Sequence, residues 1–208
     1  MIVLHLLPLT VPDATDAAWA RVGDELNRPG AVPSLVTPFG RQGEGSEARL
    51  VGCVDSGVEA IGIVLSLVRS GVWAVVVEVA EGRAAGESLL QREAERARRA
   101  SGHCAVLGLS GPSTAWIEPA LRLLGALERR RSEPQQDAGR RVEAGASQRE
   151  VAVELQVSQQ AVHARLRGGL WNETRALAGA AADALDAAAR AGGRVAHVDA
   201  SPSTFERG

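Results

Sequence analysis

The chain has 208 residues, of which 45% are hydrophobic and 23% are charged, as in an ordinary globular protein. All 23 basic residues are arginine, and the formal net charge is −2. This balance gives no global signal for binding to nucleic acid or to a membrane surface, so a DNA-binding surface would have to be a local cluster of cations.

The cysteines, the histidines and the N-terminal segment exclude several classes of protein. Cys53 and Cys104 lie far apart and outside any metal-ligand spacing, so we expect both to be reduced and buried. The four histidines are scattered, and we expect no metal site and no cofactor. The apolar segment 1–10 is too short to span a bilayer and lacks the features of a signal peptide. The sequence therefore predicts a cytoplasmic protein with no membrane partner.

Predicted strands and helices alternate in the first half of the chain. In order, we expect a strand over 2–9, a helix over 13–26, a hairpin with arms 32–39 and 49–54 joined by a Gly-rich turn over 40–45, a helix over 56–70, a strand over 72–79, a helix over 86–100 and a strand over 103–109. This order is that of a split βαβ, or ferredoxin-like, unit with an additional helix and strand.

Local signals support three of these helices. Asp13 or Thr15 is a candidate cap for the first helix. The buried face of the second predicted helix is expected to hold Val58, Ile61, Leu65 and Val68. That of the charged third helix is expected to hold Leu89, Leu90 and Ala97.

Strand patterns end near residue 115. Helices are predicted over 115–131, from Pro134 onward and then to about residue 190. We therefore predict an α+β fold with a ferredoxin-like domain over 1–112, an all-α domain over 113–191 and a loose tail over 192–208.

The segment from Ser147 to Arg167 has the pattern of a helix-turn-helix. Ser147 and Glu150 form a capping box for a first short helix, and Ser158 caps a second one. The turn is expected at Gln156, although a glycine is usual at this position. The residues expected to face inward are Val151, Ala152, Leu155, Val157, Val162 and Leu166. A third helix starting at Pro134 would complete the core.

The exposed side of the second short helix would then read double-stranded DNA. Candidate base-reading residues, with a serine at the tip of the helix, are Ser158, Gln159, Gln160, His163 and Arg167. Candidate phosphate-binding residues are Arg140, Arg141 and Arg149. The structural alternative is an ordinary helical hairpin that packs against the first domain.

Residues 146–171 resemble the C-terminal helix-turn-helix of SatD-type and related small bacterial regulators, and the promoter-reading part of sigma factors. The first half resembles the degenerate nucleotidyl-cyclase, or GGDEF-like, domain of the same regulators. The matching segments are Gly-Ser-Glu-Ala-Arg-Leu over 45–50, in place of the hairpin motif, and Arg-Ser-Gly-Val-Trp over 69–73. The resemblance implies a cyclase-like fold that senses an effector or dimerises.

The same resemblance does not extend to catalysis. A cyclase needs acids on the first strand and the hairpin to hold two metal ions, but the first strand has none. The hairpin keeps Glu44 and Glu47 in an altered motif. We therefore expect no enzyme activity. Arg41 and Arg49, which flank the Gly-rich segment, are candidates for binding a small-molecule or nucleotide effector.

The sequence thus predicts a transcriptional regulator that binds DNA as a homodimer. Two half-sites call for a two-fold pair of helix-turn-helix units. The alanine-rich helix over 177–189 and the apolar strand faces are candidate dimer contacts, and this helix is also a candidate lid on the first domain. The alternatives are a nucleotide-binding or cyclase-like enzyme with an accessory helical domain, and a module whose helix-turn-helix binds another protein.

Overall fold

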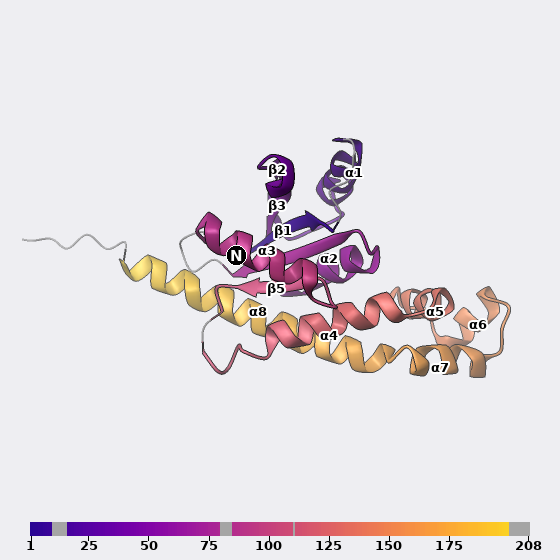
Figure 1. The fold of residues 1–208 in the computed structure, drawn as a ribbon. Coiled ribbons are helices and arrows are strands. Elements are labelled where there is room, and N and C mark those ends of the chain that lie inside the picture. The colour runs from indigo at the N-terminus through magenta and orange to yellow at the C-terminus, as the bar shows by residue number, and fades with distance from the viewer. Residues whose placement is uncertain (10–15, 80–84, 110, 200–208) are drawn as a thin grey trace, which may run out of the picture.

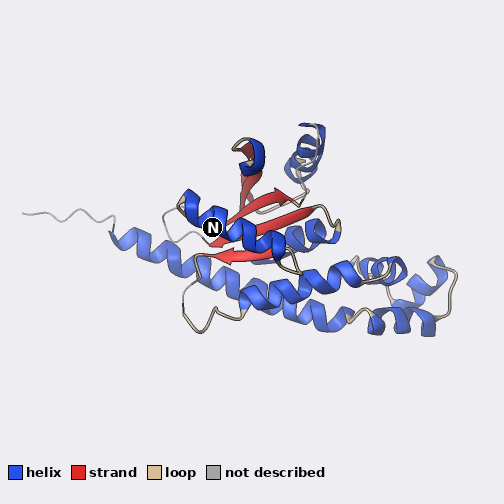
Figure 2. Ribbon diagram, in the orientation of Figure 1, coloured by secondary structure: helices blue, strands red, loops and turns tan. Residues whose placement is uncertain are grey.

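The computed structural model describes residues 1–9, 16–79, 85–109 and 111–199. A five-stranded sheet forms in the first half of the chain and helices make up the rest, which is an α+β arrangement (Figure 1 and Figure 2). The strands are β1 (Ile2–Pro8), β2 (Leu35–Gln42), β3 (Arg49–Val54), β4 (Trp73–Val79) and β5 (Cys104–Leu107). The helices are α1 (Asp16–Asn27), α2 (Gly57–Arg69), α3 (Glu87–Arg99), α4 (Ile117–Arg130), α5 (Glu133–Glu143), α6 (Gln148–Glu154), α7 (Gln159–Gly168) and α8 (Trp171–Asp199), with a short 3-10 turn, η1 (Gly45–Glu47).

The strand order across the sheet is β2-β3-β1-β4-β5. Neighbouring strands are antiparallel except β4 and β5, which are parallel and connected through α3. β1 lies in the middle, between β3 and β4. Because both faces of the sheet are covered at this strand, an almost continuous apolar run is buried there, as the sequence predicts.

The two faces of the sheet contact different helices. Alternate residues of β1 (Ile2, Leu4 and Leu6) belong to the main core, which also includes residues of α2, α4 and α8. Leu7 lies on the other face, in a smaller core with residues of β4, β5 and α3. At the end of the main core, Trp19 and Trp73 meet edge to face with ring centroids 5.3 Å apart.

Helices α4 and α8 lie antiparallel to each other beside the sheet and extend beyond its edge (Figure 1). Helices α5, α6 and α7 lie at the end of this extension. Leu121 and Leu124 of α4 and Leu185 of α8 are buried in the main core. A separate core holds Ala138, Val151, Ala152, Val162, Leu166 and Trp171. The cores are therefore grouped differently from the predicted division at residue 112, since α4 and the later part of α8 belong with the sheet.

Several local expectations are wrong. Val58 is 65% exposed and Leu89 is 38% exposed, so neither lies on a buried helix face. The predicted turn over 40–45 begins too early, because Gly40, Arg41 and Gln42 still pair with β3. The predicted tail is helical through Asp199, as part of α8. The candidate caps Asp13 and Thr15 lie outside the described residues, as does the tail beyond 199.

None of the helices in the described part of the chain combines the length and apolar character needed to cross a membrane.

Candidate nucleic-acid interface

Helices α5, α6 and α7 form a three-helix unit around the separate core. Val151 on α6 and Val162 on α7 are fully buried, and Leu166 is 5% exposed. Trp171, the first residue of α8, closes this core, with the six-membered ring of its indole against Gly139 of α5. A Cβ built at Gly139 would lie 2.2 Å from that ring, so α5 can approach the tryptophan closely only because residue 139 has no side chain.

The predicted capping box is present at the start of α6. Ser147 Oγ accepts a hydrogen bond from Glu150 N at 3.2 Å, and Ser147 N donates to Glu150 Oε2 at 2.7 Å. The hydrogen bonds from Ser147 lower the pKa of the Glu150 carboxyl group. Because α6 has only seven residues, these bonds satisfy a large share of its end groups.

The turn between α6 and α7 is a Schellman motif. Val157 N donates to Ala152 O at 3.0 Å, and Gln156 N donates to Val153 O at 3.2 Å. Gln156 has the positive φ of 52° that this motif requires. The turn therefore lies at the predicted residue, and Gln156 adopts a backbone conformation that is usually found for glycine.

Helix α7 begins at the predicted cap, with Ser158 Oγ accepting from Ala161 N at 3.1 Å. Opposite its two buried residues, α7 exposes a polar side, and every predicted base-reading residue lies in an exposed position: Ser158, Gln159, Gln160, His163 and Arg167. The first turn of α7 contains no acid. The Ser158 side chain takes up the N–H of Ala161, which leaves the N–H groups of Gln159 and Gln160 and the polar side chains for a ligand from outside.

The predicted phosphate-binding arginines differ in their surroundings. Arg140 on α5 and Arg149 on α6 are exposed, and neither forms an ion pair with a described residue. Arg141 bonds Asp137 at 3.2 Å and also Glu154, so it connects α5 to α6. Residues 132–170 contain five arginines and five acids, so the unit as a whole is neutral. Arg140, Arg149 and Arg167 are exposed and form no ion pair with a described residue, so their charge is open to a ligand.

The two candidate effector-binding arginines lie on opposite faces of the hairpin. Arg41 pairs with Leu50, a residue of the main core, and its guanidinium lies 5.5 Å from the centre of the Trp19 ring. Arg49 is buried on the other face and forms two 2.8 Å hydrogen bonds to the carboxylate of Glu87. The structure does not bring the two arginines together into one site.

A buried polar pair between β1 and β4 was not foreseen from the sequence. His5 Nε2 lies 2.8 Å from Glu78 Oε2, and both residues are 5% exposed. Glu78 Oε1 also accepts a hydrogen bond from Ala85 N at 2.6 Å. The bond from His5, followed by the bond from Ala85, lowers the pKa of Glu78 despite burial, which acts the other way. A polar residue in each of two apolar strands was the available signal.

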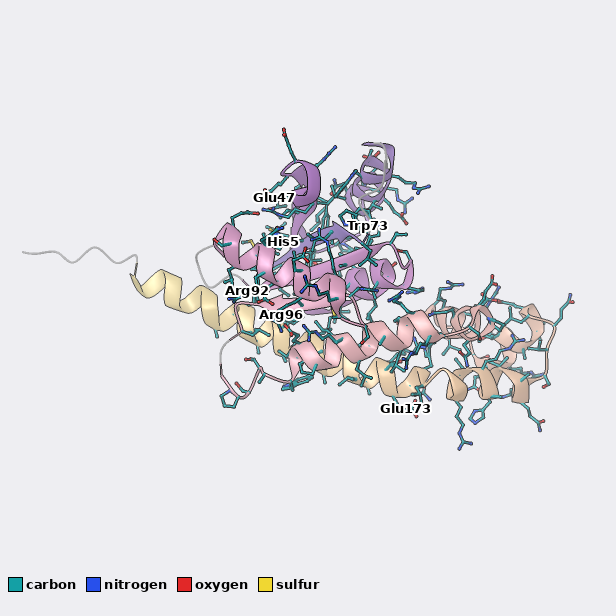
Figure 3. All side chains as sticks on the ribbon, viewed as in Figure 1. His5, Glu47, Trp73, Arg92, Arg96 and Glu173 are labelled. Atoms are coloured by element: carbon teal, nitrogen blue, oxygen red, sulfur yellow. The ribbon has the colours of Figure 1, made fainter. Side chains whose placement is uncertain are left out.

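The charged α3 carries its arginines in ion pairs. Arg96 pairs with Glu93 and with Glu118 of α4, and Arg92 pairs with Glu93 (Figure 3). In the same view, His5 lies in the sheet and Glu173 lies at the start of α8, near the three-helix unit.

Both cysteines are buried and unpaired. Burial raises the pKa of the Cys104 thiol to about 12, so the thiol stays protonated at neutral pH. Among the described residues, no three histidine, cysteine or acidic side chains are grouped so that they could hold a metal ion.

Comparison with known proteins finds no matching family model, no matching curated protein and no matching solved structure.

Proposed function

We propose that this protein binds double-stranded DNA sequence-specifically through α7 and regulates transcription. The observation that carries the proposal is the polar side of α7, held outward by a core of its own. Val162 and Leu166 anchor the helix from the opposite side. Glutamine side chains can bond an adenine edge and arginine can bond a guanine edge, and a short helix with this exposure fits the major groove.

The independence of the three-helix core argues against an ordinary helical hairpin. A hairpin packed on the first domain would bury its apolar side against the sheet or against α2. Here Val151 and Val162 meet residues of α5 and Trp171 instead. The side of α7 opposite to them therefore points to solvent and is open to DNA.

Within this proposal the arginines have separate roles. Arg140 and Arg149 contact phosphates, as do the N–H groups of Gln159 and Gln160 at the N-terminus of α7, which the Ser158 cap does not take up. Arg141 holds α5 to α6 through Asp137 and Glu154 and supports the unit from within. Replacing Arg141 would thus lower the stability of the unit and affect DNA binding only indirectly.

The test begins with selection of a preferred site from random-sequence duplex DNA, followed by affinity measurements by fluorescence anisotropy. Gln160→Ala should weaken binding to the selected site by about five- to 150-fold, equivalent to roughly 1–3 kcal/mol, with little change on random DNA. Arg149→Ala should weaken both about equally and lower the salt slope by about one. The matched control is Arg21→Ala on α1, an exposed arginine far from α7 in the fold.

The triple variant Gln159→Ala, Gln160→Ala and Arg167→Ala decides the assignment. If it stays folded and keeps full affinity for the selected site, α7 does not enter the groove. The protein-binding alternative would then replace the DNA-reading proposal.

We further propose that the first domain has a ferredoxin-like, cyclase-like fold without catalytic activity, and that the regulator is a homodimer. The strand order β2-β3-β1-β4-β5 supports this topology.

The alanine-rich face of α8 is buried in the main core, where Ala181, Ala182 and Leu185 lie. It therefore acts as a lid on the sheet, and the dimer contact must use another surface. Light scattering at micromolar concentration measures the mass, and a strictly monomeric protein with and without DNA would contradict the homodimer.

A further inference from the structure

A cavity of about 220 Å³ lies where the main core meets the three-helix unit. Residues of α2, α5 and α8 line it, together with the C-terminal end of α4. Arg69 comes from α2, Glu128 and Arg131 come from the end of α4, and Trp171, Thr174 and Arg175 come from the first turns of α8. The cavity therefore touches the main core and the core of the three-helix unit.

The side chains around this cavity carry an excess of positive charge. Glu128 is 6% exposed and is shared by two guanidinium groups. Arg69 Nε lies 3.3 Å from its Oε2, and Arg131 bonds its Oε1. At the rim, Arg175 is exposed and forms no ion pair with any described residue, although Glu143 lines the same cavity. Three arginines thus face two glutamates.

Two buried hydrogen-bond donors at the cavity have no acceptor. Arg69 Nε is close to Glu128 but is not aligned for a hydrogen bond, and Trp171 Nε1 has no partner among the described residues. A buried donor without an acceptor is unfavourable, and a cationic site strengthens any bond to an anion. Burial and the nearby charge of Arg69 both lower the pKa of Arg131, while Glu128 opposes them. These facts are explained if an anion completes the site.

We propose that this cavity binds a small oxyanion, the phosphate or carboxylate group of a metabolite, and that the bound anion adjusts DNA binding. The guanidinium groups of Arg69 and Arg175 would bond its oxygens, with the Trp171 indole N–H as a further donor. A neighbouring cavity of about 240 Å³ shares Gly62, Leu65 and Arg175 with this one and leaves room for the rest of the ligand.

The coupling to α7 passes through Arg131. Its guanidinium stacks on Trp171 at 4.3 Å from the ring centre, and its Nε donates to Gly169 O at the end of α7 at 2.8 Å. An anion that draws Arg69 and Arg175 inward would fix α2 relative to the start of α8. It would thereby fix the orientation of α7, which directly precedes α8, relative to the main core. This second half of the inference rests on the proposed DNA binding.

Isothermal titration calorimetry with inorganic phosphate and with malonate, at constant ionic strength, tests the site. Wild-type protein should bind at least one of the two saturably, and the preferred anion separates a phosphate ligand from a carboxylate ligand. Arg175→Gln should weaken that binding by about tenfold or more, because a charge-assisted bond is lost. The exposed position of Arg175 makes this change compatible with folding, and Arg21→Gln serves as the matched control. Absence of saturable binding by both anions, or equal affinity in Arg175→Gln, overturns the site.

The regulatory half needs a second measurement on the full chain. The affinity for the selected DNA should differ with and without saturating anion in the wild type and in Arg21→Gln, but not in Arg175→Gln. An anion that binds at the site without any change in DNA affinity overturns the coupling. If the anion binds but neither the wild-type protein nor the variants bind DNA, the proposed function fails while the anion site stands.

Discussion

At the scale of single residues, Gln156 and the His5–Glu78 pair are two places where local preference and native structure disagree. Gln156 holds a left-handed backbone with φ 52°, which costs a residue with a side chain about 1–2 kcal/mol relative to the right-handed form. Glu78 is a carboxylate buried in a strand of valines. In each case the surroundings impose the conformation or the charge, which makes the residue a good site for a test.

Gln156→Gly should stabilise the protein by about 1 kcal/mol, because glycine adopts this φ without strain. Urea denaturation measures the free energy of unfolding. Gln156→Ala, which keeps the Cβ, is the control and should leave the stability nearly unchanged. A glycine variant that is less stable than the alanine variant would contradict the role of strain at this turn.

Acid should destabilise the protein through Glu78. Its pKa in the folded protein is lowered from the ordinary 4.5, first by the hydrogen bond from His5. The folded state then holds this proton less tightly than the unfolded chain does. The resulting stability is present above the ordinary carboxyl value and is lost as pH falls from 4.5 through the lowered value.

Glu78→Gln keeps the shape of the side chain and removes the titration. The free energy of unfolding should therefore change less steeply with pH below about 4.5 in this variant than in the wild type. Equal slopes for the two proteins in urea denaturation series would show that Glu78 does not carry the acid sensitivity. Glu95→Gln on α3, where the side chain is 43% exposed, serves as the matched control.

At the scale of elements, α6 is stabilised by its ends and by the partner helices around it. It has seven residues, fewer than an isolated helix needs in water. The capping box at its start and the Schellman turn at its end satisfy end groups that would otherwise need water. Val151 and Ala152 then bury one side of it against α5 and α7. The caps and the packing on α5 and α7 therefore both contribute to the stability of α6.

Ser147→Ala should lower the stability of the three-helix unit by about 1 kcal/mol, since the cap to Glu150 N is lost. Ser147→Asp, which supplies a carboxylate oxygen at the same cap, should retain most of it. Hydrogen exchange of the α6 amides reports the local effect. An alanine variant with unchanged protection in α6 would mean that the cap does not support this helix.

At the scale of the whole molecule, the main core at the sheet is separate from the core of the three-helix unit α5–α7. Helix α8 begins in the core of the three-helix unit with Trp171 and continues into the main core with Leu185. The core of the three-helix unit has few members and is therefore expected to open at lower free energy than the sheet.

Val162→Ala should reduce hydrogen-exchange protection in α5–α7 while leaving β1 and β4 protected at native level. Leu185→Ala, at a fully buried position of the main core, should cost about 2–5 kcal/mol and lower protection in the sheet. If either change lowers protection equally in both regions, the two cores unfold as one unit.

Local patterns in the sequence were sufficient for the elements whose partners are close along the chain. The caps at Ser147 and Ser158 and the turn at Gln156 depend on hydrogen bonds within a few residues, and all three lie where the sequence predicts them. The apolar runs over 2–9 and 72–79 likewise predicted strands, and β1 and β4 lie there with nearly all residues buried.

Only the tertiary structure decided which surfaces are shared and which charges meet. Val58 has the spacing of a buried residue yet lies exposed, because the neighbouring face of α2 is the one that meets α4 and α8. Arg141, a predicted phosphate contact, forms ion pairs with Asp137 and Glu154 that the sequence did not indicate. Arg69, Glu128 and Arg175 come from α2, α4 and α8, which are far apart along the chain but pack together in the fold. Periodicity specifies which side of a helix is apolar, but contacts between helices far apart in the chain decide where that side and its charges lie.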